Sequence, residues 1–155
     1  MQTRAAVNAL ENARARANAM SAAIETALEG GDGSSGLLEE AAAAAREIDY
    51  PRSRAMALAT IAQASAQAQG RPQAIRLLDE AEANARNVKD RAARIRTYVV
   101  IAGAAAHAGD RPRAIRLLDE AEANARDVDD RSEWQNAMSA VVRAQAELGE
   151  WRHGP

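Results

Sequence analysis

Apolar and polar residues follow one another along this chain with the spacing of amphipathic helices. Between residues 111 and 127, the apolar residues recur at three- and four-residue steps: Ala114, Leu117, Leu118, Ala121 and Ala125. This spacing places them on one stripe of an α-helix and the charged residues on the opposite side. The same pattern predicts seven helices, over residues 3–29, 35–48, 52–69, 71–87, 91–108, 111–127 and 131–149.

A long internal repeat organises these helices. Residues 71–90 (RPQAIRLLDEAEANARNVKD) return as residues 111–130 (RPRAIRLLDEAEANARDVDD), and 17 of the 20 positions are identical. Each unit holds a first helix, a tight turn, a second helix and a short connection. Such a unit cannot bury its apolar face alone, so units must stack. We therefore expect an all-α protein, an α-solenoid of about seven antiparallel helices.

The repeat also predicts the domain organisation. We expect a single helical-repeat domain over residues 1–150 and a tail at 151–155. Its units cover about 1–50, 51–90 and 91–130, and a capping helix covers 131–150. The predicted outer face of this last helix carries Asn136, Ser139, Arg143 and Glu147, which suits a cap that faces water.

The helix ends carry recognisable signals. Pro112 falls in the first turn of a predicted helix, where its missing N–H removes no intrahelical bond. Asp90 and Asp130 precede helices and are suited to accept hydrogen bonds from first-turn N–H groups. Gly109 follows a helix and predicts its C-terminal stop.

Charged side chains are predicted to pair on exposed helix faces. Glu82 precedes Arg86 by four residues, and Glu122 precedes Arg126 in the same way, with the acid first, the favourable order on a helix surface. We expect both pairs to be solvated, so removal of the Glu82 side chain should change stability by less than about 0.5 kcal/mol.

Composition and charge narrow the possible functions. The chain has 20 Lys and Arg against 22 Asp and Glu, a formal net charge of −2, which gives no broad attraction to nucleic acid or to acidic membranes. Cysteine is absent, so disulfides and thiol catalysis are excluded. No apolar run approaches the ~20 residues of a membrane span, and the N-terminus lacks a signal-peptide core. We expect a cytoplasmic protein without membrane contact.

No set of residues predicts catalysis. His107 and His153 lie far apart and outside any metal-binding spacing. The glycine-rich stretch at 30–36 lacks the Lys-Ser/Thr of a phosphate-binding loop, so we interpret it as a turn. We expect no catalytic, metal-binding or cofactor-binding residues, no cofactor and no enzyme activity.

The chain resembles the tetratricopeptide-repeat family. Small residues stand at the family's spacing at Ala62, Ala74 and Ala81, with Leu78 at its larger apolar position; Ala102, Ala114, Leu118 and Ala121 repeat the pattern. Gly109–Asp110 is similar to the turn between the two helices of a unit. The family's aromatic positions are mostly replaced, by Leu58, Ser65 and Ala105, and Tyr98 remains. The period is about 40 residues, against about 34 residues in the standard repeat. The resemblance implies a right-handed solenoid with an atypical period.

The two parts of the repeat have diverged unevenly. The second helices are almost duplicated, whereas the first helices differ. In the family that the chain resembles, first helices line the concave surface. The resemblance therefore implies a groove formed by Ala59, Thr60, Gln63, Arg96, Val99, Gly103, Asn136, Ser139 and Arg143. Such a groove suits a protein or peptide partner, and we expect a non-enzymatic interaction scaffold.

Three alternatives remain open. The chain would also suit a designed or idealised repeat protein with a structural role and no natural ligand. A solenoid with open ends is able to self-associate into a homo-oligomer. Weak nucleic-acid binding is the third alternative, although we do not expect it, because neither an uninterrupted basic face nor stacking aromatics are present.

Overall fold

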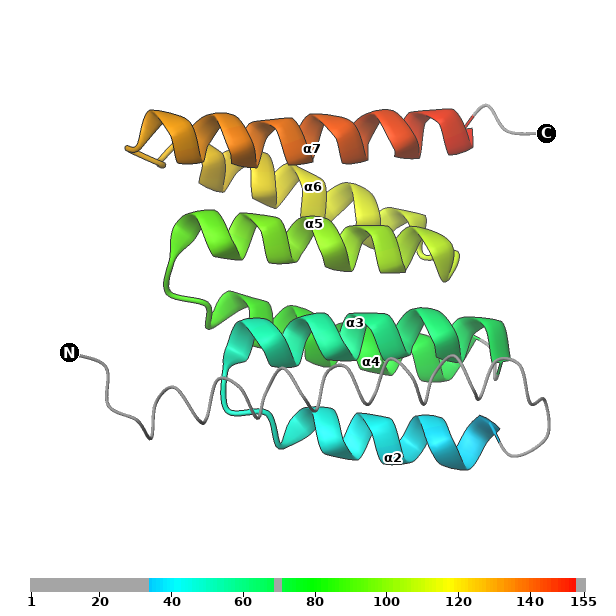
Figure 1. The fold of residues 1–155 in the computed structure, drawn as a ribbon. Helices are drawn as coiled ribbons and strands as arrows, with labels where there is room; N and C mark the ends of the chain where they lie inside the picture. The colour runs from blue at the N-terminus through cyan, green and yellow to red at the C-terminus, as the bar shows by residue number, and fades with distance from the viewer. Residues whose placement is uncertain (1–33, 69–70, 153–155) are drawn as a thin grey trace.

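The computed structural model describes residues 34–68 and 71–152 (Figure 1). Within these ranges the protein contains helices and no strand. The helices are α2 (Ser34–Arg46), α3 (Pro51–Ala68), α4 (Arg71–Arg86), α5 (Arg91–His107), α6 (Arg111–Ala125) and α7 (Arg131–Arg152). They confirm six predicted helices to within about three residues at each end. The predicted helix over 3–29 lies outside the described residues.

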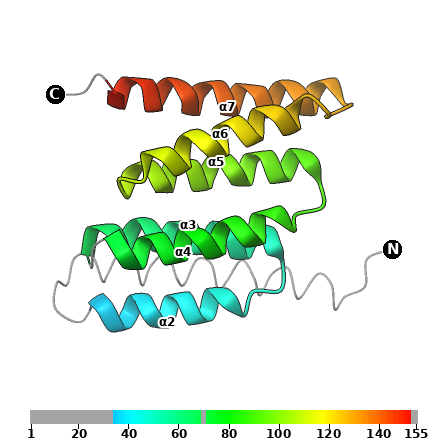
Figure 2. The same cartoon turned by 180° about the vertical axis from the view of Figure 1, so that it is seen from behind.

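Consecutive helices run antiparallel, and they form a stack with α2 at one end and α7 at the other (Figure 1). The helices α3, α5 and α7 form one row, in which α3 contacts α5 and α5 contacts α7. The helices α4 and α6 lie on the other side of the stack, each packed against the helix before and after it (Figure 2). The helix α2 lies at one end of the stack and packs against α3.

Leucine and alanine dominate the buried core between these helices. Leu77, Leu78, Leu117 and Leu118 are all buried, which confirms that the predicted apolar stripe faces inward. The small residues that carry the family resemblance are buried with them: Ala62, Ala74, Ala81, Ala102, Ala114 and Ala121. Because alanine side chains are short, the helix axes can approach one another closely.

The predicted helix ends are confirmed in detail. Gly109 has φ of 81°, a left-handed conformation that glycine adopts at low cost. The N–H of Gly109 bonds to the Ala106 carbonyl and the N–H of Asp110 to the Ala105 carbonyl, which together form a Schellman motif. At the other end of α5, the Asp90 carboxylate accepts from the Ala93 N–H at 2.9 Å. The Asp130 carboxylate accepts from the Glu133 N–H at 3.0 Å and begins α7 in the same way.

Ion pairs join the second helices of neighbouring units. Arg46 of α2 donates two hydrogen bonds to the carboxylate of Glu80 in α4, at 2.7 and 2.8 Å. This bidentate contact raises the pKa of Arg46, chiefly through the hydrogen bond with Glu80. The second helices are therefore connected through their charged side chains as well as through the core.

The prediction that Glu82 lies on a solvated surface is wrong. Its expected partner Arg86 does bond to it, at 3.1 Å, but Glu82 is only 7% exposed. Two arginines of α6 cover it: Arg116 donates at 2.6 Å, and Arg113 approaches to 3.6 Å. Glu82 is thus the centre of a charged cluster between α4 and α6, which the spacing within one helix could not reveal.

Glu122, the counterpart of Glu82 in the next unit, has different contacts. Its predicted ion pair with Arg126 does not form in the described part of the chain. Instead, its carboxylate accepts a hydrogen bond from Gln145 of α7 at 3.3 Å. No further second helix follows α6 within the described residues to supply arginines equivalent to Arg113 and Arg116.

Arginine side chains also bond to backbone carbonyls at equivalent places in successive units. Arg54 bonds to the Ile48 carbonyl and Arg94 to the Val88 carbonyl, at 2.8 and 2.9 Å, and the two contacts are related by the shift of the repeat. At the opposite ends of the helices, Arg71 at the start of α4 bonds to the Gly109 carbonyl, and Arg111 at the start of α6 bonds to the Leu148 carbonyl. Ile48, Val88 and Gly109 lie just after the ends of α2, α4 and α5, so three of these four bonds hold the connections between helices.

Candidate functional site

The predicted groove residues lie on α3, α5 and α7. We call the exposed surface of this row the first-helix face. Six of these residues are exposed: Thr60, Arg96, Gly103, Asn136, Ser139 and Arg143. Gln63 and Val99 are partly buried. Ala59 is 1% exposed and belongs to the core, because α3 is packed against α2, α4 and α5, so we remove it from the predicted surface.

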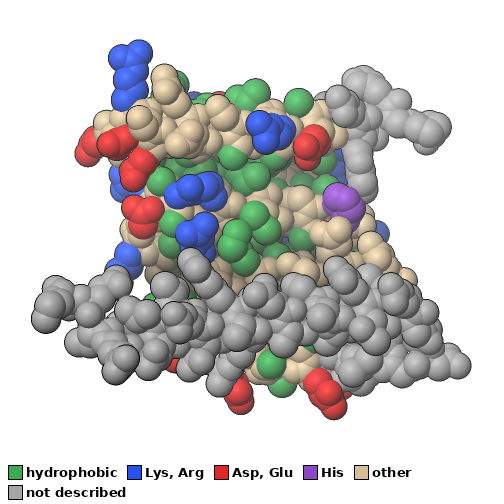
Figure 3. All heavy atoms as spheres, in the orientation of Figure 1, with side chains coloured by type: hydrophobic (Ala, Val, Ile, Leu, Met, Phe, Trp, Pro, Cys, Tyr) green, Lys and Arg blue, Asp and Glu red, His purple; other side chains and the backbone are tan. Residues whose placement is uncertain are grey.

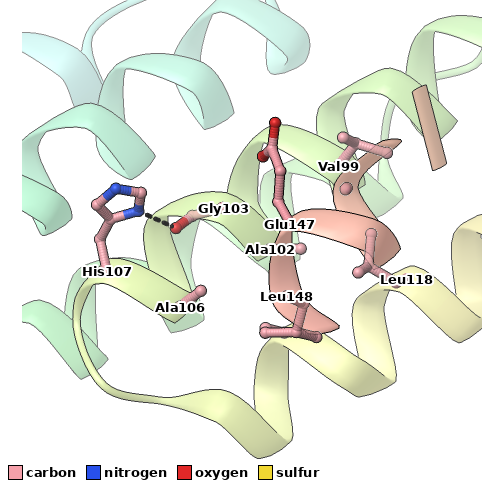
Figure 4. A pocket seen from close by; sticks show the side chains of 10 residues that line it. Val99, Ala102, Gly103, Ala106, His107, Leu118, Glu147 and Leu148 are labelled. Carbon is pink, nitrogen blue, oxygen red and sulfur yellow. Dashed lines mark hydrogen bonds between the residues drawn. The ribbon is translucent and has the colours of Figure 1, made fainter. Parts of the chain in front are cut away.

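A pocket of about 120 Å³ lies between α5, α6 and α7. It brings together two of the predicted residues, Val99 and Gly103, with others that the sequence analysis did not select (Figure 4). The complete lining is Val99, Ala102, Gly103, Ala106 and His107 of α5, Ala114 and Leu118 of α6, and Ala144, Glu147 and Leu148 of α7. On the first-helix face, hydrophobic side chains gather over α5 and α7 with charged side chains around them (Figure 3).

The pocket exists because the residues that surround it are small. Gly103 carries no side chain, and a Cβ atom built on it would meet nothing within 4 Å. Val99, Gly103 and His107 are four residues apart along α5, so they follow one another on one side of this helix. Four alanines complete much of the lining: Ala102, Ala106, Ala114 and Ala144. Three helices meet here without enough side-chain volume to fill the space between them.

Two polar side chains border this apolar lining. Glu147 is exposed and forms no ion pair within the described residues, and no Lys or Arg lines the pocket. The other is His107, whose ring Nδ1 lies at 2.9 Å from the Gly103 carbonyl oxygen of the same helix (Figure 4). A carbonyl oxygen can only accept, so Nδ1 carries the hydrogen in this bond. The pocket is thus an apolar cavity with a carboxylate at its rim.

The exposed side of α7 is less polar than the sequence suggested. Asn136, Ser139 and Arg143 border a shallow depression, as expected for a solvated cap. However, Trp134 and Val142 border it too, and they are 40% and 55% exposed. In the unit before, the counterpart of Trp134 is Arg94, which bonds to the Val88 carbonyl. Trp134 forms no such bond to the equivalent Val128 carbonyl within the described residues, and its ring lies at the surface.

The described residues contain neither a group of three or more His, Asp or Glu that could hold a metal ion nor a helix long and apolar enough to cross a membrane. The fold and the pocket together define an all-helical protein with repeated helix pairs and an apolar pocket. No protein-family model matches the chain, and comparison with curated proteins and with solved structures gave no match.

Proposed function

We propose that the protein is a right-handed, tetratricopeptide-like solenoid whose first-helix face binds another protein or a peptide. The solenoid arrangement is supported by contacts that recur from one unit to the next. Arg54 and Arg94 bond to equivalent carbonyls, and the row of α3, α5 and α7 places equivalent helices side by side. In a stack of this kind each unit contacts its neighbours, which gives an extended surface for a partner.

The pocket between α5, α6 and α7 is the observation that carries the binding proposal. Protein–protein interfaces gain much of their affinity from a few side chains that fill well-packed pockets. This pocket contains Val99 and Gly103 of the predicted groove. The exposed Arg96 and Arg143 side chains, which form no hydrogen bond or ion pair within the described residues, would contact the partner around it. We propose a non-enzymatic role, in which the mostly apolar lining binds a partner by burial of an apolar group.

Substitutions on opposite sides of the stack test this proposal. Arg96→Glu reverses a charge on α5, and Arg76→Glu reverses one at an exposed position of α4 as the matched control. Proteins or peptides that bind the wild-type chain should lose at least about tenfold in affinity for R96E and keep their affinity for R76E. Calorimetry on each purified pair measures the difference. Equal affinities for wild type and R96E would show that the partner does not use this face.

A second candidate function is self-association through α7. It is favoured by the exposed Trp134 and Val142 at the end of the described helices. An open stack that continues head to tail would bury both side chains. Sedimentation velocity over a hundredfold range of protein concentration should then show growing oligomers, and Val142→Glu should abolish them. A monomer at all concentrations would exclude this function.

A further inference from the structure

We propose that the pocket between α5, α6 and α7 receives one apolar side chain of about leucine size from a segment that carries a positive charge beside it. The apolar group lies against Ala102, Leu118 and Leu148, and the cation pairs with Glu147 at the rim. This inference rests on the proposed function and names the chemistry of the partner.

The size of the pocket sets the size of the apolar group. An apolar cavity of about 150 Å³ in another protein is known to hold benzene, a molecule of six carbons. A pocket of about 120 Å³ that opens to the surface therefore suits a group of about four to six carbons. Leucine and methionine side chains are in this range. A tryptophan side chain is too large, and an alanine side chain would leave most of the pocket empty.

The charge at the rim sets the sign of the neighbouring group. Glu147 is the one carboxylate that lines the pocket, and no cationic side chain of the described residues forms an ion pair with it. Arg143 lies one turn earlier on α7, beside the pocket, but it lines the shallow depression and forms no ion pair with Glu147 within the described residues. A positive charge on the partner would pair with Glu147, whereas a negative one would be repelled. Since both groups are exposed, this pairing contributes selectivity more than affinity.

Small amphiphiles separate these two contributions. We would titrate the 155-residue protein with n-pentylammonium, 1-pentanol, pentanoate and ethylammonium, and follow backbone amide shifts by NMR. Shifts should centre on Val99, Gly103 and Leu148. Because burial of one methylene changes affinity about fourfold, ethylammonium should bind at least tenfold more weakly than n-pentylammonium. Pentanoate should bind more weakly than 1-pentanol. Binding of pentanoate as tight as that of n-pentylammonium would overturn the charge assignment.

Variants connect this binding to the pocket. Glu147→Gln should weaken n-pentylammonium binding about twofold to fivefold and leave 1-pentanol binding unchanged. Gly103→Leu should fill the mouth and abolish binding of both. Gly149→Leu is the matched control: it also adds a leucine at a helical glycine with open space around it, but outside this pocket, so binding should persist. If circular dichroism shows that G103L is folded and the variant still binds n-pentylammonium, the proposal is overturned.

These experiments distinguish a failure of the pocket proposal from a failure of the proposed function. A partner whose affinity falls in R96E but not in G103L or E147Q would support the first-helix face and refute this pocket as the anchor site. If n-pentylammonium binds at the pocket and the partner has the same affinity for R96E as for wild type, the pocket is supported and the wider surface is refuted. For a partner segment itself, replacing its apolar residue by alanine should weaken binding to wild type at least tenfold and leave binding to G103L unchanged.

Discussion

Arg116 of α6 donates a hydrogen bond to Glu82 of α4, with 2.6 Å between the guanidinium Nη2 and the carboxylate oxygen. The two residues are 34 positions apart and join the second helices of successive units. The contact raises the pKa of Arg116, first through the hydrogen bond with Glu82. Arg113, which is only 12% exposed, lies beside the same carboxylate. The interface between these units therefore contains a largely buried negative charge with positive charges around it.

We predict that Glu82→Ala destabilises the protein by about 2 kcal/mol, because removal of one member of a buried charge cluster is strongly unfavourable. The substitution leaves the Arg113 guanidinium in a partly buried position without one of its acidic neighbours. Arg86 and Arg116 are about half exposed and can turn to water, which limits the loss. Chemical denaturation measures the free energy of unfolding.

The repeat supplies the control for this prediction. Glu122→Ala removes the equivalent carboxylate from an almost identical helix, where its one hydrogen bond within the described residues is from Gln145 at 3.3 Å. This variant should lose about 0.5 kcal/mol or less. Equal losses in the two variants would mean that the arginines of α6 do not stabilise Glu82.

We predict that Leu78→Ala and Leu118→Ala each lower the free energy of unfolding by about 2–5 kcal/mol. Both side chains are buried between helices, and a truncated side chain would leave a cavity there. Ile115→Ala, at a more exposed position of the same helix as Leu118, should lose about 1 kcal/mol or less. A larger loss for Ile115 than for Leu118 would contradict the assigned core. Urea denaturation of all three variants decides between these outcomes.

The sequence predicted the six described helices, and the caps at Asp90, Asp130 and Gly109, because the signals for them are local. The apolar spacing predicts a helix from residues within a few turns. Asp90 and Gly109 predict the ends of α5 from contacts with residues close in sequence. The burial of Glu82 depends on a neighbouring helix instead, and one of the three differences between the repeats gives the only sequence signal for it. Position 113 is Arg, whereas its counterpart Gln73 has no charge. A periodicity within one helix cannot show that this arginine reaches across to α4.

The pocket was not predictable from the sequence for a different reason. Part of its lining consists of residues with no side chain or a very short one, namely Gly103 and alanines of three helices. Elsewhere in the chain the same residue types allow close helix packing, as Ala62 and Ala74 do in the core. Whether small residues bring helices together or leave a space between them depends on how far apart the backbones lie. Only the relative placement of α5, α6 and α7 distinguishes the two cases.

We predict that Ser65→Ala leaves stability unchanged or raises it by about 1 kcal/mol. A buried hydroxyl without a partner has lost its hydrogen bonds to water on folding, and no hydrogen bond within the protein replaces them. The Ser65 hydroxyl is buried in α3 and has no hydrogen-bond partner in the described part of the structure. The next unit carries Ala105 at this position, and it is equally buried.

Thr97→Val is the matched control for Ser65→Ala. The Thr97 hydroxyl is also buried, but it donates to the Ala93 carbonyl at 2.7 Å. Its removal should therefore lower stability by about 1 kcal/mol. Thermal unfolding by calorimetry compares the two variants. A loss of stability in S65A similar to that in T97V would show that the Ser65 hydroxyl has a partner in solution.

The last prediction concerns alkaline pH and depends on Tyr98 in α5. Burial raises the pKa of the Tyr98 phenol above its ordinary value of about 10. Below pH 10 the phenol is protonated in both the folded and the unfolded chain, so its contribution to stability is fully present. Above pH 10 the unfolded chain loses this proton more readily than the folded one, and stability falls as the pH rises through the folded pKa. Tyr98→Phe should remove this part of the alkaline loss, because phenylalanine has no phenolic proton to lose. Denaturant unfolding at pH 8, 10 and 11 compares the variant with wild type, and an alkaline loss in Y98F as large as in wild type would show that Tyr98 is not its source.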